Sequence, residues 1–246
     1  MNLKKIKNNN YLTNKKYLVL WGSNLSSTAG IRYTKYELSI IKLPNDIKSI
    51  MVGIILSDGH IALNFKAKNA FLILNQSLAK SAYVYFVFSF LSHYYHSYPK
   101  LSISYRLDRP SYMLIIATRS MPCITELYYN YYLNKIKNIK PFIFFDLTPI
   151  ALAHWIMGDG TFNGTGLLLC TDSFKIKEVV LLINVLMIRY SINCTIRYHS
   201  KKYPRIYISK KYIIPLCKIV LPYMDKSMLY KLGLCIKRKL AERLKQ

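Results

Sequence analysis

Acidic residues are scarce in this chain of 246 residues. It contains 11 Asp and Glu against 36 Lys and Arg, which gives a formal net charge of +25 at pH 7. This excess is larger than solubility requires, so it predicts a polyanionic partner and binding that weakens as salt is added. The basic residues are spread along the whole chain, which favours a folded basic surface over a basic tail. A ribosome-associated protein or a protein bound to a membrane surface could carry the same excess.

The sequence also lacks cysteines at the spacing of a zinc site and apolar runs long enough to span a membrane. The longest stretch without Lys, Arg, Asp or Glu, residues 81–99, contains Tyr, Ser and two histidines, and it predicts a buried helix followed by a polar loop rather than a membrane span. Residues 1–16 are rich in Lys and Asn, so no signal peptide is expected. The scattered cysteines predict neither a zinc site nor a disulfide framework, but small core residues in a reducing compartment. They are Cys123, Cys170, Cys194, Cys217 and Cys235.

Two short segments share one pattern. Residues 51–59 and residues 152–160 are both apolar runs that end in a small residue, an aspartate and a glycine. These final triplets are Ser57-Asp58-Gly59 and Gly158-Asp159-Gly160. The spacing between the copies is too long for a solenoid repeat and fits two half-domains. The apolar content of 52% supplies enough material for a sizeable core.

Both runs are predicted to be helices. Thr148 followed by Pro149 indicates an N-cap and a first helical residue for the second run, and Asn45 or Asp46 is expected to cap the first. The glycine after each aspartate is expected to end its helix in the left-handed conformation. These two residues are Gly59 and Gly160.

Each aspartate then lies at a helix C-terminus, where the helix dipole disfavours an anion by up to about 1 kcal/mol. Two such aspartates at matched positions suggest that a cation offsets this cost. Ser57 and Gly158 are small enough to let the helices pack closely, which would bring Asp58 and Asp159 to one end of the pair as a hard-metal site. Two buried helices that end in ordinary Asp-Gly turns are the simpler alternative, and the matched copies favour the site.

The residues after each run predict the order αββαββα in both halves. Alternating patterns indicate strands, and Gln76-Ser77 and Asp172-Ser173 are expected to cap the middle helices. In the first half the expected elements are strands 60–66, 71–75, 101–107 and 112–118 and helices 78–91 and 120–133. In the second half they are strands 161–165, 167–171, 194–199 and 205–209 and helices 174–190 and 209–220.

Strand alternation predicts a sheet with an apolar face toward its helices and a basic face outward. Ile103 and Tyr105, for example, alternate with Ser104 and Arg106. Two-stranded ribbons of this kind fit the major groove of DNA, although exposed strand faces are commonly polar for other reasons. The predicted DNA-binding residues are Asn64, Lys66, Lys68, Arg106, Arg109, Arg197, His199, Lys202 and Arg205.

On these two motifs the chain resembles the LAGLIDADG homing endonucleases, in the single-chain form with two motif copies. Residues 147–155 look typical of the second copy, and residues 20–27 resemble intron-encoded members. The resemblance runs from about residue 17 to about residue 240. It implies an α+β fold with two pseudo-symmetric αββαββα halves, saddle-shaped antiparallel sheets and the motif helices as their interface. We expect an N-terminal extension at 1–43, a first half at 44–140 and a second half at 141–246.

The resemblance also implies a chemistry. The acidic motif position maps to Asp58 and Asp159, which would be catalytic and would bind Mg²⁺, as two or three ions between the halves, with the carbonyls of Ser57 and Gly158. The substrate would be a long asymmetric DNA site, cut across the minor groove to leave 3′ overhangs. Bound Mg²⁺ would activate water and stabilise the leaving 3′ oxygen.

A basic residue is expected near each scissile phosphate, where it would stabilise developing charge or orient the water. Lys231 matches this position in the second half; in the first half Lys137 is preferred and Lys140 is the alternative. Leu56 and Met157 replace an acid often found at motif position six, which is a variable position. His154 stands where the first copy has a glycine, so the helix interface should be asymmetric.

The main alternative is an intron-splicing maturase that binds RNA, and a basic organellar structural protein is a third possibility. The intact aspartates favour cleavage, because RNA binding does not need carboxylates that face a polyanion. The abundance of Lys, Asn, Ile, Tyr and Phe indicates an A/T-rich genome, such as an organellar one. Together with the resemblance to intron-encoded members, this leads us to expect an organelle-encoded mitochondrial protein, and no membrane contact is expected. Both motifs lie in one chain and the first hairpins differ in length, which predicts a monomer that cuts a non-palindromic target.

Overall fold

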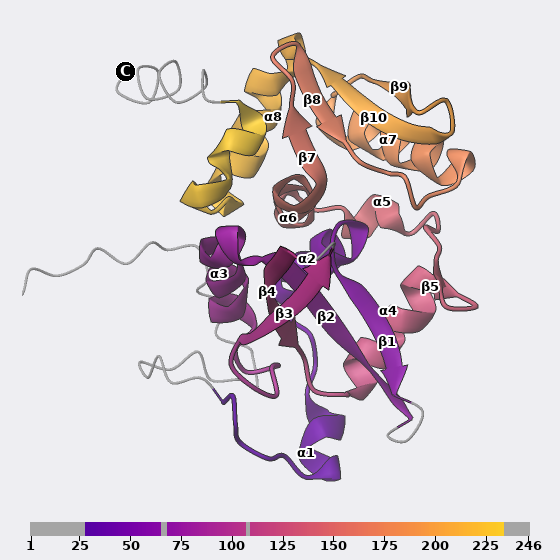
Figure 1. Ribbon diagram of the computed structural model, residues 1–246. Helices are drawn as coiled ribbons and strands as arrows, with labels where there is room; N and C mark the ends of the chain where they lie inside the picture. The colour runs from indigo at the N-terminus through magenta and orange to yellow at the C-terminus, as the bar shows by residue number, and fades with distance from the viewer. Residues whose placement is uncertain (1–27, 65–67, 107–108, 234–246) are drawn as a thin grey trace, which may run out of the picture.

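The computed structural model describes residues 28–64, 68–106 and 109–233, and it contains two open four-stranded antiparallel sheets (Figure 1). The strand orders are β1-β2-β4-β3 and β7-β8-β10-β9, so the two sheets have matching topologies. Each half has the predicted order αββαββα, which confirms the predicted fold class. Within the described ranges, no helix is both long and apolar enough to cross a membrane.

The first half follows a short helix, α1 (Lys35–Ile40). Its elements are α2 (Asn45–Leu56), β1 (His60–Asn64), β2 (Asn69–Ser77), the 3-10 turn η1 (Leu78–Lys80), α3 (Ser81–Leu91), β3 (Lys100–Arg106), β4 (Arg109–Ala117) and α4 (Pro122–Tyr131). The connection to the second half contains the small hairpin β5 (Tyr132–Leu133) and β6 (Ile136–Lys137) and the short helix α5 (Ile143–Asp146).

The second half repeats the arrangement with shorter first strands. Its elements are α6 (Pro149–Asp159), β7 (Gly160–Phe162), β8 (Gly166–Leu169), α7 (Ile176–Tyr190), β9 (Cys194–His199), β10 (Tyr203–Ser209), η2 (Lys210–Tyr212), α8 (Ile213–Val220), η3 (Leu221–Tyr223) and η4 (Lys226–Leu232). The strand β9 has the predicted bounds, and most other elements differ from the prediction by a few residues.

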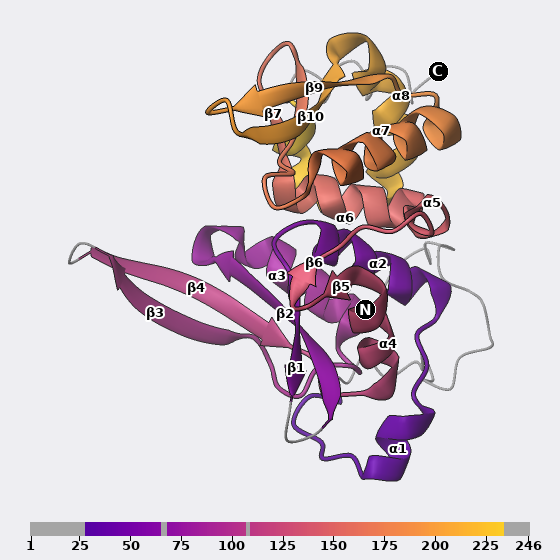
Figure 2. The same ribbon diagram turned by 90° about the vertical axis from the view of Figure 1, so that its right-hand side faces the viewer.

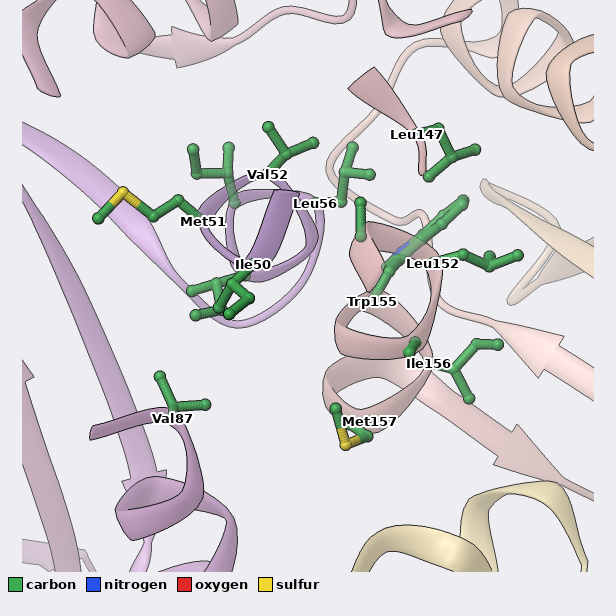
Figure 3. Packing of buried hydrophobic residues seen from close by; sticks show 14 of the residues in the cluster. Ile50, Met51, Val52, Leu56, Val87, Leu147, Leu152, Trp155, Ile156 and Met157 are labelled. Atoms are coloured by element: carbon green, nitrogen blue, oxygen red, sulfur yellow. The ribbon is translucent and has the colours of Figure 1, made fainter. Parts of the chain in front are cut away.

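The motif helices α2 and α6 lie side by side at the centre of the molecule in both views (Figures 1 and 2). They approach backbone to backbone, because a Cβ atom added to Gly53 would overlap the carbonyl oxygen of Ala151. A Cβ atom added to Gly158 would likewise overlap the side chain of Ser57. Their apolar side chains point into the cores of both halves (Figure 3). A helix that is apolar on every side is a buried helix, which explains why these runs lack a polar face.

The caps of the motif helices agree with the prediction at one of four places. The hydroxyl of Thr148 accepts a hydrogen bond from the N–H of Ala151, as predicted. The predicted cap at Asn45 or Asp46 is wrong, because the helix already begins at Asn45 and Pro44 occupies the N-cap position without a side-chain hydrogen bond.

The predicted left-handed C-cap glycines are also wrong. Gly160 has φ −70° and ψ 143°, and among the described glycines a positive φ occurs at Gly30, Gly164 and Gly233. The chain passes from α6 directly into β7, and from α2 into β1 through residues 57–59. A Cβ atom at Gly160 would lie 2.5 Å from the carbonyl oxygen of Ile156, and one at Gly59 would overlap the side chain of Ile54. Glycine is therefore needed for space and not for its conformational freedom.

The predicted cap of α7 by Asp172-Ser173 is wrong as well. The helix begins at Ile176 with Lys175 at the N-cap position, and the carboxylate of Glu178 accepts the N–H of Lys175. Asp172 instead forms an ion pair with Arg205, with 2.6 Å between Oδ2 and Nη2. In the first half Ser77 does cap η1, whereas its neighbour Gln76 is the penultimate residue of β2.

The prediction that the apolar face of β3 packs on helices is wrong for most of that strand. Ile103 and Tyr105 are 51% and 75% exposed, and Tyr112, which pairs with Ile103 across the hairpin, is also exposed. The β3–β4 ribbon extends away from the body of the molecule, beyond the helices that cover the rest of the sheet (Figure 2). The alternation of the strand was predicted correctly, but its burial depends on how far the covering helices reach.

Candidate functional site

The two motif aspartates lie at the same end of the central helix pair. Asp159 is the last residue of α6, and Asp58 follows the last turn of α2. The contact between Ser57 and Gly158 brings them together, since a Cβ atom at Gly158 would lie 3.4 Å from Oδ2 of Asp58. The close packing expected from these two small residues therefore places both carboxylates in one site.

In each half, a lysine donates a hydrogen bond to the backbone carbonyl of the residue that precedes the motif aspartate. The Nζ atom of Lys137, on β6, donates to the carbonyl oxygen of Ser57 at 2.9 Å. The Nζ atom of Lys231, in η4, donates to the carbonyl oxygen of Gly158 at 3.1 Å. Lys140 donates to the carbonyl of Tyr129 instead, so only the preferred of the two first-half candidates reaches this site.

Burial changes the protonation behaviour of this cluster. It raises the pKa of Asp159 to about 7, with a further contribution from the negative charge of Asp58. Burial lowers the pKa of Lys137 to about 8, and it also lowers the pKa of Lys231, to which the charge of Lys80 adds. Burial therefore opposes the charge of Asp159 and of both lysines, and a bound cation and a phosphate would supply the opposite charges that stabilise them.

Gln76 and Lys80 belong to this site and were missed as site residues from the sequence. The buried side chain of Gln76 donates through Nε2 to Oδ2 of Asp58. The signal that could have identified it is its position in β2, because it continues the inward series of Ala70, Leu72 and Leu74 as a polar residue. The positive charge of Lys80, in η1, lowers the pKa of Asp159.

The donor atoms at this site are suitable for a hard divalent cation. The carboxylates of Asp58 and Asp159 and the carbonyl oxygens of Ser57 and Gly158 are all oxygen ligands, which Mg²⁺ prefers. Among the described residues there is no group of three or more His, Cys, Asp or Glu that could hold a metal. Water and substrate phosphate oxygens are the further ligands that Mg²⁺ commonly takes.

An apolar cavity of about 330 Å³ lies at the opposite, N-terminal end of the motif helices. Ile47, Ile150 and His154 are among the residues that line it. Burial lowers the pKa of His154 to about 3, so its ring is neutral. The ring stacks on that of Phe86, with 5.9 Å between the centroids. His154 thus fills space at the asymmetric part of the interface, where its Nδ1 atom lies 3.3 Å from the hydroxyl oxygen of Tyr83.

The predicted DNA-binding residues of the second half lie on one sheet face and at its tip. Arg197 and Arg205 are opposite each other in the β9–β10 pair, while Ile206 and Ile208 point into the core. The guanidinium of Arg197 stacks over the ring of Tyr207, at 3.3 Å from the centroid. Arg205 is held by its ion pair with Asp172. The exposed residues of the β9–β10 tip include His199 and Lys202.

The first-half candidates lie near the ends of the β1–β2 and β3–β4 ribbons. Lys68 is exposed in the β1–β2 turn with φ 58°, and Arg109 is exposed at the start of β4. Asn64, the last residue of β1, is partly buried. Arg106 ends β3 with its side chain outside the described atoms, and Lys66 lies outside the described residues.

Two αββαββα halves that meet at a helix pair with twin acid–lysine ends have the architecture of LAGLIDADG proteins with two motif copies. The chain belongs to the LAGLIDADG DNA endonuclease family, whose family model matches residues 48–214. The family resemblance carried by the two sequence motifs is thereby confirmed.

Individual relatives have names of two kinds. The chain is 31% identical over 242 residues to "Cytochrome b mRNA maturase bI2" of Saccharomyces cerevisiae, a match that covers 93% of this chain and 55% of the yeast protein. It is 39% identical over 123 residues to "Intron-encoded endonuclease ai4" of Dictyostelium discoideum, covering 47% of this chain and 72% of that one. The chain thus spans about half the length of the yeast maturase.

Among solved structures, the chain is similar to the homing endonuclease I-WcaI bound to its DNA recognition sequence. The TM-score is 0.73 at 29% sequence identity, and the match covers 78% of this chain and 87% of I-WcaI. The similarity therefore extends over both halves.

Proposed function

We propose that this chain is a site-specific DNA endonuclease that makes a metal-dependent double-strand break in a long asymmetric target, as in intron homing. The observation that carries the proposal is the twofold repetition of one arrangement. In each half a lysine donates to the carbonyl that precedes the motif aspartate, Lys137 for Asp58 and Lys231 for Asp159. A double-strand break needs two such centres, one for each scissile phosphate.

The two halves are assigned to residues 44–140 and 141–246. Asp58, Asp159 and the carbonyls of Ser57 and Gly158 would hold two or three Mg²⁺ ions. When bound, such ions supply Lewis-acid activation of water and stabilisation of the leaving 3′ oxygen.

The chain's own residues complete the site. Lys137 and Lys231 place positive charge where negative charge develops on the phosphates. Gln76 holds one oxygen of Asp58 through its amide and so fixes the orientation of that carboxylate. The exposed basic residues on the sheet faces and ribbon tips would bind the duplex. We further propose that the protein acts as a monomer on double-stranded DNA and is an organelle-encoded mitochondrial protein.

The test is cleavage of a randomised duplex library in the presence of Mg²⁺, followed by sequencing of the cut ends. The expected result is one long asymmetric consensus. Asp58→Asn and Asp159→Asn should each abolish double-strand cleavage and leave DNA binding intact or tighter, because each removes an anion near a phosphate. Near-wild-type cleavage by either variant overturns the assignment.

An RNA-binding splicing maturase is the second candidate function. The match to the yeast "Cytochrome b mRNA maturase bI2" favours it, since it covers 93% of this chain. Two measurements distinguish these functions: nicking of DNA in the presence of Mg²⁺, and binding of an intron RNA transcript. A maturase alone would bind the transcript and leave every duplex in the library uncut.

A further inference from the structure

Glu178 is a buried acid of α7 that lies outside the acidic pair. Its side chain is 3% exposed, and its two oxygens accept from two different parts of the chain. One oxygen accepts the N–H of Lys175 at 2.6 Å and closes the first turn of α7. The other accepts the N–H of Ile139 at 2.9 Å, in the connection between the halves. Capping explains the first bond, and the second joins α7 to a different segment.

Ile139 lies two residues after Lys137, and it is buried. Between them, the N–H of Asn138 donates to the carbonyl of Tyr131 at 2.8 Å. The strip from 137 to 139 is therefore held at one end by the bond from Lys137 to Ser57 and at the other by Glu178. Without the Glu178 carboxylate, the N–H of Ile139 would be buried with no acceptor. Because a buried N–H without an acceptor is unfavourable, we expect residues 137–139 to shift when that carboxylate is lost.

We propose that Glu178 is a positioning residue for Lys137, so that an acid of the second half sets the lysine that reaches the first motif. The anchoring itself is independent of function, whereas its catalytic consequence rests on the proposed endonuclease activity. Lys231 has a different support. It lies in η4, whose N-cap is Asp225, and the Asp225 side chain accepts the N–H of Ser227 at 2.9 Å. The two lysines therefore lie on segments that two different carboxylates anchor.

This separation predicts an effect on one DNA strand. Glu178→Gln keeps the volume of the side chain but leaves a single acceptor oxygen for two N–H groups. It should slow cleavage of one strand by roughly tenfold, and the affected strand should be the one that Lys137→Met slows. Asp225→Ala, which removes the acceptor of the Ser227 N–H, should slow the other strand, which is the strand that Lys231→Met slows.

The experiment uses the full chain and the duplex recovered from the library selection, labelled on either strand and followed in single turnovers with Mg²⁺. The double variant Lys137→Met/Glu178→Gln should cut the affected strand no more slowly than Lys137→Met alone, since both changes act through one lysine. The matched control is Glu37→Gln, because Glu37 closes the capping box of α1 with Thr34 and is connected to neither lysine. It should leave both strands unchanged.

A second readout does not need activity. Hydrogen exchange at the amide of Ile139 should be faster in Glu178→Gln than in the wild type, and exchange across η4 should be unchanged. Equal slowing of both strands, or an unchanged rate on both, overturns the positioning role. If the wild type cuts no duplex, the endonuclease proposal fails by itself, and unchanged exchange at Ile139 then overturns the anchor.

Discussion

At the scale of single residues, the carboxyl group of Asp159 lies in surroundings that oppose its ionisation. Its pKa is raised to about 7 from an ordinary 3.8, chiefly by burial and then by the charge of Asp58. The folded chain therefore binds this proton more tightly than the unfolded chain does. Its contribution to stability is complete below about pH 4 and is lost as the pH rises to about 7.

The Asp159→Asn variant tests this linkage. In metal-free buffer at pH 7.5 it should be more stable than the wild type, by at most about 4 kcal/mol, because the unfavourable ionisation is removed. The measurement is urea unfolding at a series of pH values with a chelator present. Asp172→Asn is the control and should make the chain less stable at this pH, because the hydrogen bond with Arg205 lowers the pKa of Asp172 and so favours its ionised form in the folded chain. Equal pH dependence in the Asp159→Asn variant and the wild type would contradict the assigned environment.

Metal addition should reverse the effect at the same residue. If Asp58 and Asp159 hold Mg²⁺, the ion binds the folded state and raises the thermal midpoint of the wild type at pH 7.5. The double variant Asp58→Asn/Asp159→Asn should show no such rise, and a chelator should cancel it in the wild type. A midpoint that responds to Mg²⁺ equally in both proteins would place the ion elsewhere.

At the scale of elements, the sequence patterns identified most strands and helices but not the local reasons for their ends. The strand β9 and the cap at Thr148 follow from alternation and a Thr-Pro pair, which are local signals. The ends at Gly59 and Gly160 depend on how closely the backbone passes Ile54 and Ile156 of the preceding helical turn, and a cap pattern in the sequence does not reveal that spacing. Lys137 was found by resemblance, whereas Gln76 was missed because the end of its strand was read as a cap.

The contact between the motif helices gives a prediction about packing. Gly158→Ala should destabilise the chain by about 1–3 kcal/mol, because the new Cβ atom would overlap the side chain of Ser57. Ser57→Gly in the same chain removes the overlapped atoms and should restore part of the stability. Thermal unfolding of the two single variants and the double variant measures this. Strictly additive effects would show that the two residues do not meet.

The β9–β10 pair gives a prediction about recognition. Replacing Arg197 or Arg205 by alanine should cost roughly 1–3 kcal/mol of binding and relax sequence preference locally if the side chain contacts a base. A phosphate contact would instead weaken all duplexes about equally. Binding titrations against singly substituted duplexes distinguish these cases, with Arg106→Ala for the first half. Wild-type affinity and preference in all three variants would mean that the DNA-facing surface lies elsewhere.

At the scale of the whole molecule, both centres and both sheets are already present in one chain, so a second copy adds nothing that the proposed reaction needs. The halves are also unequal, because β1 and β2 contain more residues than β7 and β8. Each half therefore offers a different surface to its half-site, which predicts a non-palindromic target. With a net charge of +25, extra copies should collect on DNA at low salt, so the test belongs at moderate salt. Sedimentation with one cleavable duplex should give a 1:1 complex that cuts both strands. A requirement for two chains per duplex, or a preference for palindromes, would contradict the monomer.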